Sequence, residues 1–250
     1  LQDCDLVLWA DTFNDAYEPE QLVAAYELAT AMGYRVALSG AAASKPLCCG
    51  RSALSVGMVD QARQMALDCL EALAPAIDRG VPVVGLEPSC ILSLRDEWLV
   101  MHLGERANRL AKQAMLFEEW WVAEQQAGRL KGGEALADQT VYVHGHCHQK
   151  AMGALSPTIA ALQGQGAKVV SIESSCCGMA GSFGYEAAHQ AVSKAMAQAS
   201  LLPAVASAPA DALLVADGFS CRHQIADLST RQAEHAVMVL HKAICSAKGR

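Results

Sequence analysis

The sequence predicts an α/β fold made of two pseudo-symmetric, Rossmann-like, three-layer units with parallel sheets. Short apolar runs alternate with segments whose apolar residues recur at helical spacing, and the same order of elements occurs twice along the chain. Strands that alternate with helices form parallel sheets, and such sheets place binding sites at the carboxyl ends of their strands. With 250 residues, 52% of them apolar, the chain can bury a core without help from disulfides.

Each half reads in the order strand, helix, strand, Cys-Cys-Gly loop, long helix, strand, and then a Ser-Cys pair. In the first half the six elements before that pair are expected over residues 6–9, 20–32, 34–38, 48–50, 59–73 and 81–86. In the second half they are expected over residues 140–143, 157–162, 167–172, 175–184, 186–206 and 212–216. The repeat predicts a first cysteine-rich unit over 1–102, a helical connector over 103–139 and a second unit over 140–250.

Composition excludes several classes of function. The 26 acidic and 19 basic side chains give a net charge of −7, which argues against nucleic acid or an anionic membrane as the main partner. No apolar run approaches the roughly 18 residues of a membrane span, and the polar first residues are unlike a signal peptide. We expect a cytoplasmic protein, either free or peripheral to the inner face of a membrane. Because the chain opens on Leu1, we also expect a processed chain or a domain of a longer protein.

Ten cysteines are the strongest compositional signal. In a chain of this length without an export signal, reduced thiols that bind a metal are favoured over a disulfide framework. Four of the cysteines form two pairs of sequence neighbours, Cys48-Cys49 and Cys176-Cys177. Neighbouring α-carbons lie about 3.8 Å apart, which is too close for an unstrained disulfide. The pairs are therefore interpreted as paired thiolates.

The second half supplies four cysteines from three strand ends: Cys147, Cys176, Cys177 and Cys221. Four thiolates are the usual ligand set of an iron–sulfur cluster. Gly178 and Gly181 allow the loop to turn sharply and to present backbone N–H groups to a bound anion or cluster. The sequence thus predicts a metal site here, with these glycines as part of the cofactor cradle.

The doubled Cys-Cys-Gly loop with matching strand-end cysteines resembles the cysteine-rich CCG domain. That domain occurs in the B subunit of heterodisulfide reductase and in iron–sulfur subunits of glycolate oxidase, lactate utilisation and anaerobic glycerol-3-phosphate dehydrogenase systems. A narrower resemblance is to the carboxyl-terminal segment of large flavin-linked D-2-hydroxyacid dehydrogenases, of the D-lactate or D-2-hydroxyglutarate type. It rests on the motifs at residues 8–14, 47–51, 85–90, 144–148, 176–184 and 216–221.

The family pattern has five cysteines per unit, and both units depart from it. Gly218 replaces the first closing cysteine of the second unit, which leaves four. In the first unit Thr12 or Asp11 stands at the strand end and Glu87 replaces the first closing cysteine, so that only Cys48, Cys49 and Cys90 remain. These three could still hold a labile cluster or zinc with a carboxylate. Alternatively, this degenerate unit only helps to pack the fold.

Histidines and arginines beside the motifs remain open to two interpretations. His144, His146 and His148 are candidate metal ligands, hydrogen-bond donors to a cluster or proton carriers, or else a satisfied polar strand end. Arg51 and Arg222, which follow motif cysteines, either offset thiolate charge, hold a substrate carboxylate or form ordinary ion pairs.

The resemblance implies an electron-transfer domain with a [4Fe-4S] cluster. Reduced FAD, held in a flavin domain absent from this chain, would supply the electrons, and a quinone or other acceptor would take them. A flavin domain and a ferredoxin-like domain are the implied partners, and the isolated chain is expected to be inactive as a dehydrogenase. The alternatives are a structural or docking module whose cysteines hold zinc or nothing, and thiol–disulfide chemistry at a cluster.

Overall fold

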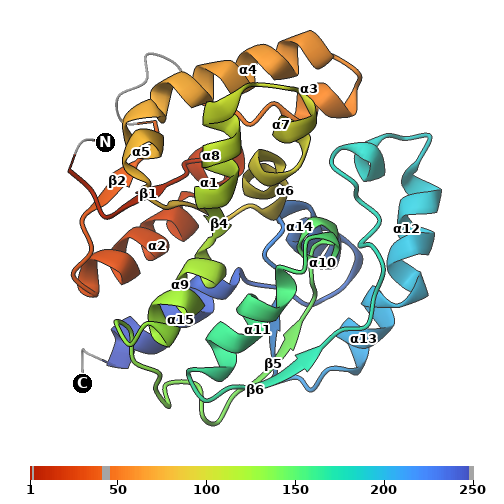
Figure 1. Ribbon diagram of the computed structural model, residues 1–250. Coiled ribbons are helices and arrows are strands. Elements are labelled where there is room, and N and C mark those ends of the chain that lie inside the picture. Colours follow the sequence, from red (N-terminus) through yellow and green to blue (C-terminus); the bar gives the residue numbers. More distant parts are fainter. Residues whose placement is uncertain (2, 41–45, 248–250) are drawn as a thin grey trace. The chain divides into compact units, whose positions relative to one another are not determined.

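The computed structural model describes residue 1, residues 3–40 and residues 46–247 (Figure 1). It divides into two compact units, Leu1–Trp120 and Trp121–Arg250. Each unit contains one small sheet in which every pairing is parallel. The predicted α/β fold with parallel sheets is therefore confirmed.

The sheet of the first unit has the strand order β2-β1-β3-β4. Its strands are short: β1 Leu6–Leu8, β2 Val36–Leu38, β3 Val83–Gly85 and β4 Ala114–Leu116. The first three fall within the runs that the sequence predicted as strands. The helices are α1 Thr12–Ala16, α2 Pro19–Ala31, α3 Arg51–Ser55, α4 Val59–Ala72, α5 Ala74–Arg79, α6 Pro88–Ile91, α7 Glu97–Val100 and α8 Glu105–Gln113, with a 3-10 turn at Leu92–Arg95. Helix α9 spans Phe117–Gln126.

The sheet of the second unit has the strand order β6-β5-β7, formed by β5 Thr140–Val143, β6 Lys168–Ser171 and β7 Leu213–Val215. Its helices are α10 Cys147–Ala151, α11 Leu155–Gln163, α12 Gln190–Ala199, α13 Leu201–Ser207, α14 Phe219–Leu228 and α15 Ala236–Ala247, with a 3-10 turn at Phe183–Tyr185. The order of the first three strands of each unit is thus the same: the second strand, the first and then the third.

The register of the two sheets is also equivalent. The backbone N–H that follows the first strand donates to the third strand in both units, from Trp9 to Val84 O (2.7 Å) and from His144 to Val215 O (2.8 Å). Trp9 and His144 therefore occupy matching positions, as do the first residues of the next helices, Thr12 and Cys147. The pseudo-symmetry read from the sequence is present in the backbone.

Two segments differ from expectation. The segment 103–139, expected as a helical connector, contains β4 between α8 and α9. Helix α8 ends at Gln113, the backbone is extended from Ala114, and β4 pairs with β3 at the edge of the first sheet. The helix expected over 186–206 is two helices, because the backbone of Ser200 departs from helical geometry, with φ −153° and ψ −39°, and α13 starts after it. Pro203 cannot donate to a carbonyl four residues earlier, so it is accommodated in the first turn of a new helix.

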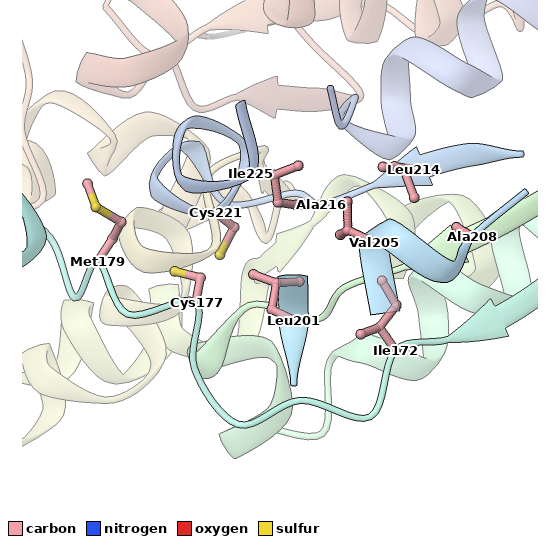
Figure 2. Close-up of a cluster of buried hydrophobic side chains, with 10 residues drawn as sticks. All are labelled: Ile172, Cys177, Met179, Leu201, Val205, Ala208, Leu214, Ala216, Cys221 and Ile225. Carbon is pink, nitrogen blue, oxygen red and sulfur yellow. The ribbon is translucent and has the colours of Figure 1, made fainter. Parts of the chain in front are cut away.

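The core of the second unit reaches the cysteines. A cluster of buried apolar side chains includes Leu201, Val205 and Ile225 and, in the same group, Cys177 and Cys221 (Figure 2). Two thiols are thus fixed by core packing rather than carried on a surface loop. Across the described ranges, we find no helix whose length and apolar character would let it cross a membrane.

Candidate metal centre

Three strand ends of the second unit deliver the four predicted cysteines. Cys147 is the first residue of α10, after β5; Cys176 and Cys177 lie in the loop after β6; Cys221 lies in the first turn of α14, after β7. Cys177 and Cys221 are buried, whereas Cys147 and Cys176 are partly exposed. Figure 2 draws the side chains of Cys177 and Cys221 next to one another.

Hydrogen bonds between sulfur atoms join these four residues in a row. Cys147 pairs with Cys176, and the sulfur of Cys177 lies between Cys176 and Cys221, so that its single S–H can donate to either of them. These bonds hold the pKa of Cys176 and of Cys221 far below the ordinary thiol value. The same bonds, together with burial, raise the pKa of Cys147 and Cys177. Ionisation of the metal-free row therefore favours Cys176 and Cys221, and a thiolate is the form that binds metal.

His144 extends the row at its buried end. One ring nitrogen of His144 and the sulfur atoms of Cys177 and Cys221 all lie within 4.8 Å of one another. The histidine contributes to the low pKa of Cys221, after the larger effect of Cys177. Of the three histidines that the sequence left open, His144 is thus the one that the fold brings into a compact set with the cysteines.

The backbone of the Cys-Cys-Gly loop is held by several contacts. The N–H of Gly178 donates to Cys176 Sγ at 3.3 Å. Gln224 Nε2 donates to Cys177 O at 2.9 Å, and Lys150 Nζ donates to Ser174 O and Ser175 O, each at 2.6 Å. Sequence reasoning missed Gln224 and Lys150. Their spacing could have identified them, because each lies three residues after a motif cysteine and therefore on the same side of its helix as that cysteine.

The two predicted cradle glycines have different surroundings. Gly178 has a φ of +96°, and a Cβ there would lie 2.2 Å from Ser193 O, so both conformation and space require glycine. Gly181 also has a positive φ, of +70°, but it is exposed and open space surrounds the position of its Cβ. The turn alone accounts for Gly181.

Gly218 stands where the family pattern has a cysteine, and the structure gives a reason. A Cβ at this position would lie 2.4 Å from Cδ2 of His146 and 3.2 Å from Cys221 Sγ. His146 is itself fixed, because its Nδ1 accepts the N–H of His148 and it caps α10. The imidazole of His146 thus fills the space that a side chain at position 218 would need.

The first unit brings together Cys48, Cys49 and Cys90, but not in the same way. Here two carboxylates beside the cysteines cap helices: Asp11 Oδ1 accepts the N–H groups of Phe13 and Asn14, and Glu87 Oε1 accepts from Ser89. Glu87 stands in place of the first closing cysteine, whereas Asp11 precedes Thr12, which matches Cys147. Within the described residues, the ligand atoms of these three cysteines do not form a set as compact as that of His144, Cys177 and Cys221.

The charge state of the first unit is also different. Hydrogen bonding to Cys49 and burial raise the pKa of Cys48, while the bond from Cys49 to Cys90 and burial outweigh the opposing bond with Cys48 and raise the pKa of Cys49. For Cys90 the bond with Cys49 lowers the pKa, but burial and the carboxylates of Asp11 and Glu87 raise it to about 11. All three residues are therefore neutral thiols at neutral pH, unlike the row in the second unit.

The two arginines serve the fold. Arg51 pairs with Glu97 at 3.2 Å. Arg222 is buried and donates from one guanidinium nitrogen to Ala216 O (2.8 Å) and Asp217 O (2.7 Å), where it satisfies carbonyls beyond the end of β7. Of the interpretations left open, an ion pair describes Arg51. Arg222 instead stabilises the turn that leads into α14.

The donor set of the second unit fits a thiophilic metal group. Four cysteines meet the need of an iron–sulfur cluster, and the lowered pKa of Cys176 and Cys221 favours the thiolate form that a metal requires. The same sulfur atoms with His144 also meet the preference of zinc for a mixture of sulfur and nitrogen ligands. The residues thus fit a metal or iron–sulfur site without choosing between the two.

Comparison with known proteins agrees with this geometry. Residues 141–226 match the family model of the CCG cysteine-rich domain. The chain is 29% identical over 204 residues to the C subunit of anaerobic glycerol-3-phosphate dehydrogenase from Escherichia coli K12, covering 80% of this chain and 50% of the relative. It is 31% identical over 169 residues to D-2-hydroxyglutarate dehydrogenase of the same strain, covering 66% and 16% respectively.

The D-2-hydroxyglutarate dehydrogenase of Pseudomonas putida is 28% identical over 242 residues, or 94% of this chain and 22% of the relative. The resemblance drawn from the motifs is therefore confirmed, and residues 141–226 of the second unit are the part that matches the CCG cysteine-rich domain. The chain spans half the length of the glycerol-3-phosphate dehydrogenase subunit and less than a quarter of either hydroxyglutarate dehydrogenase.

Proposed function

We propose that this chain is the iron–sulfur electron-transfer domain of a flavin-linked D-2-hydroxyacid dehydrogenase. A [4Fe-4S] cluster would be bound by four thiolates of the second unit: Cys147, Cys176, Cys177 and Cys221. The observation that carries the proposal is the row of four sulfur atoms drawn from three strand ends. The likeness to parts of two kinds of dehydrogenase supports a role inside an oxidoreductase.

Each residue around the row has a definite part in this function. The thiols of Cys147 and Cys177 lose their protons when they become ligands, so loading releases protons to solvent. The N–H of Gly178 donates to Cys176 Sγ, and hydrogen bonds to ligand sulfurs tune a cluster's reduction potential. Lys150 and Gln224 hold the loop, which keeps the ligands in place while charge changes. The cluster itself would supply one-electron exchange.

The hydroxyacid chemistry would take place elsewhere. Reduced FAD in a flavin domain would donate electrons, a ferredoxin-like domain would accompany it in the same or a partner chain, and a quinone or other acceptor would receive them. This chain alone would then have no dehydrogenase activity. We place it in the cytoplasm, free or peripheral to the inner face of a membrane.

A structural or docking module with zinc is the second candidate, and one observation favours it. His144, Cys177 and Cys221 form a compact nitrogen and sulfur set of the kind that structural zinc sites use. Zinc would hold the ends of β5, β6 and β7 together without any redox role.

Metal analysis of protein purified without oxygen separates the two functions. We expect about four irons and four sulfides per chain, lost in Cys176→Ser and retained in Cys48→Ser. The second variant is a matched control, because Cys48 holds the equivalent place in the first unit and is similarly part-exposed. One zinc per chain, or no metal with the fold intact, would overturn the electron-transfer proposal.

A further inference from the structure

His144 is buried at the end of β5, with one ring nitrogen beside Ser174 and the other facing the cysteines. The side chain is 1% exposed, and Nδ1 lies 2.8 Å from Ser174 Oγ. Among the described residues Nε2 has no nitrogen or oxygen partner, and it faces the sulfur of Cys221. Sulfur is a weak hydrogen-bond partner, so a buried ring nitrogen placed against sulfur alone needs a physical reason.

The surroundings of His144 suggest that this reason is metal binding. A ring nitrogen of His144 and the sulfurs of Cys177 and Cys221 lie within 4.8 Å of one another. Tetrahedral ligands at metal–sulfur distances near 2.3 Å and metal–nitrogen distances near 2.0 Å would be roughly 3.5–3.8 Å apart. The three atoms therefore need to move only slightly to share one ion.

The contact with Ser174 fixes how the ring is presented. When Nδ1–H donates to Ser174 Oγ, Nε2 carries a lone pair and no proton. Metal-binding histidines commonly donate their other ring N–H to an oxygen in this manner, which sets both tautomer and orientation. Ser174 thus occupies the place of a supporting residue for a ligand, rather than that of a chance neighbour.

The comparison between units points the same way. The first unit has Trp9 at the position of His144, so the shared fold does not require an imidazole there. The second unit also lacks a thiol at Gly218, where the ring of His146 excludes a side chain. A nitrogen donor at His144 gives this site a fifth potential ligand in place of the thiol missing at position 218.

We propose that His144 is a metal ligand, whose Nε2 binds the same ion or cluster as Cys177 and Cys221. The inference rests on the proposed function only for the nature of the metal group. On a [4Fe-4S] cluster, which takes four protein ligands, His144 would take the place of one of the four cysteines proposed as ligands. A neutral imidazole in place of a thiolate makes the site less negative and its reduction potential higher than with thiolates alone.

Pulsed electron paramagnetic resonance tests this directly. Two samples are made from one preparation: the chain reconstituted with iron and sulfide and then reduced, and the metal-free chain loaded with Co(II). We expect hyperfine coupling to nitrogen in at least one sample, with the pattern changing when histidine alone is labelled with ¹⁵N. Because this experiment uses the unaltered chain, it does not depend on a variant that folds.

Variants then identify the histidine. His144→Gln should lose the nitrogen coupling and bind Co(II) at least about tenfold more weakly, the lower bound for removing even a supporting residue. His148→Gln, in the same histidine run but outside the compact set, should keep both. No histidine coupling in either sample, or coupling that persists in His144→Gln, overturns the inference. Iron and sulfide content is measured separately, so loss of the electron-transfer proposal is distinguished from loss of the ligand.

Discussion

The two units share a backbone plan but differ in the chemistry at equivalent positions. Both place a Cys-Cys-Gly loop after the second strand and a cysteine after the third, and in both the glycine has a positive φ, +81° at Gly50 and +96° at Gly178. In the second unit the sulfurs form a row beside a histidine, and ionisation of the row favours Cys176 and Cys221. In the first, three neutral thiols lie near two buried carboxylates.

This difference shows how a ligand position can be turned into a structural one. Glu87, which stands in place of a closing cysteine, and Asp11 satisfy helix N-termini, which stabilises the strand-to-helix turns. Their negative charge also opposes ionisation of Cys90. The two carboxylates thus stabilise the fold while they make a thiolate site less favourable. We therefore propose that the second unit is the principal metal site.

The largest expected difference is in ionised sulfur. Metal-free, fully reduced chain at pH 7 should show ultraviolet absorbance of about two thiolates, because the pKa values of Cys176 and Cys221 are lowered. Cys176→Ser should remove at least half of this absorbance, and Cys48→Ser should leave it unchanged. An equal loss of thiolate absorbance in both variants would contradict the difference in ionisation between the two units.

The loop glycines test the part that the units share. Gly178→Ala combines a positive φ with a Cβ placed 2.2 Å from Ser193 O, and we expect a loss of about 3–5 kcal/mol in the free energy of unfolding. Gly50→Ala, where the Cβ would be 2.8 Å from Ala62 O, should cost about 2–4 kcal/mol. Urea unfolding of the metal-free variants measures both. If neither substitution changed the free energy of unfolding, the close contacts of these glycines with Ser193 and Ala62 would be contradicted.

Asp11 gives the first unit a pH dependence of its own. Burial, and then the charge of Glu87, raise the pKa of Asp11 from 3.8 to about 6 in the folded chain. The folded state thus binds this proton more tightly than the unfolded state, so stability should fall as pH rises from about 4 to 6. Asp11→Asn should remove up to about 3 kcal/mol of that fall. Urea titrations at several pH values measure it, and an unchanged slope would contradict the assignment.

The smallest predicted effect concerns Ser174. Ser174→Ala leaves Nε2 of His144 in place but removes the oxygen that orients the ring. We expect a roughly tenfold loss of affinity for Co(II) with little change in unfolding. Ser55→Ala in the first unit, whose hydroxyl donates only to a carbonyl in its own helix, is a control for the loss of a serine hydroxyl. Equal affinity in wild type and Ser174→Ala would remove the supporting role of Ser174.

The strands were predictable because their apolar runs are short, are bounded by turn residues and alternate with helical segments along the chain, a combination that is typical of buried strands. The expected strand over 140–143 coincides with β5, and the other expected strands are longer than the observed ones by one to three residues. Strand β4 could not be predicted, because Ala114-Met115-Leu116 is equally compatible with a helix. Only its pairing with β3 decides its conformation.

The site was predictable in its cysteines but not in its surroundings. Paired cysteines at matched strand ends suit few roles besides metal binding, whereas a histidine beside a strand end suits core, cap or ligand equally well. Burial and a ring nitrogen that lies beside two cysteine sulfurs distinguish His144 from His146, which caps α10, and both properties depend on tertiary packing. The contacts of Gln224 and Ser193 with the Cys-Cys-Gly loop likewise join segments far apart in the sequence.

The central claim is that the second unit, rather than the first, holds the metal group, and one measurement tests it most directly. Iron and sulfide are counted in two variants purified without oxygen: one with serine at Cys48, Cys49 and Cys90, the other with serine at Cys147, Cys176, Cys177 and Cys221. We predict about four irons and four sulfides in the first variant and none in the second. Iron lost from the first variant and kept by the second would contradict the account.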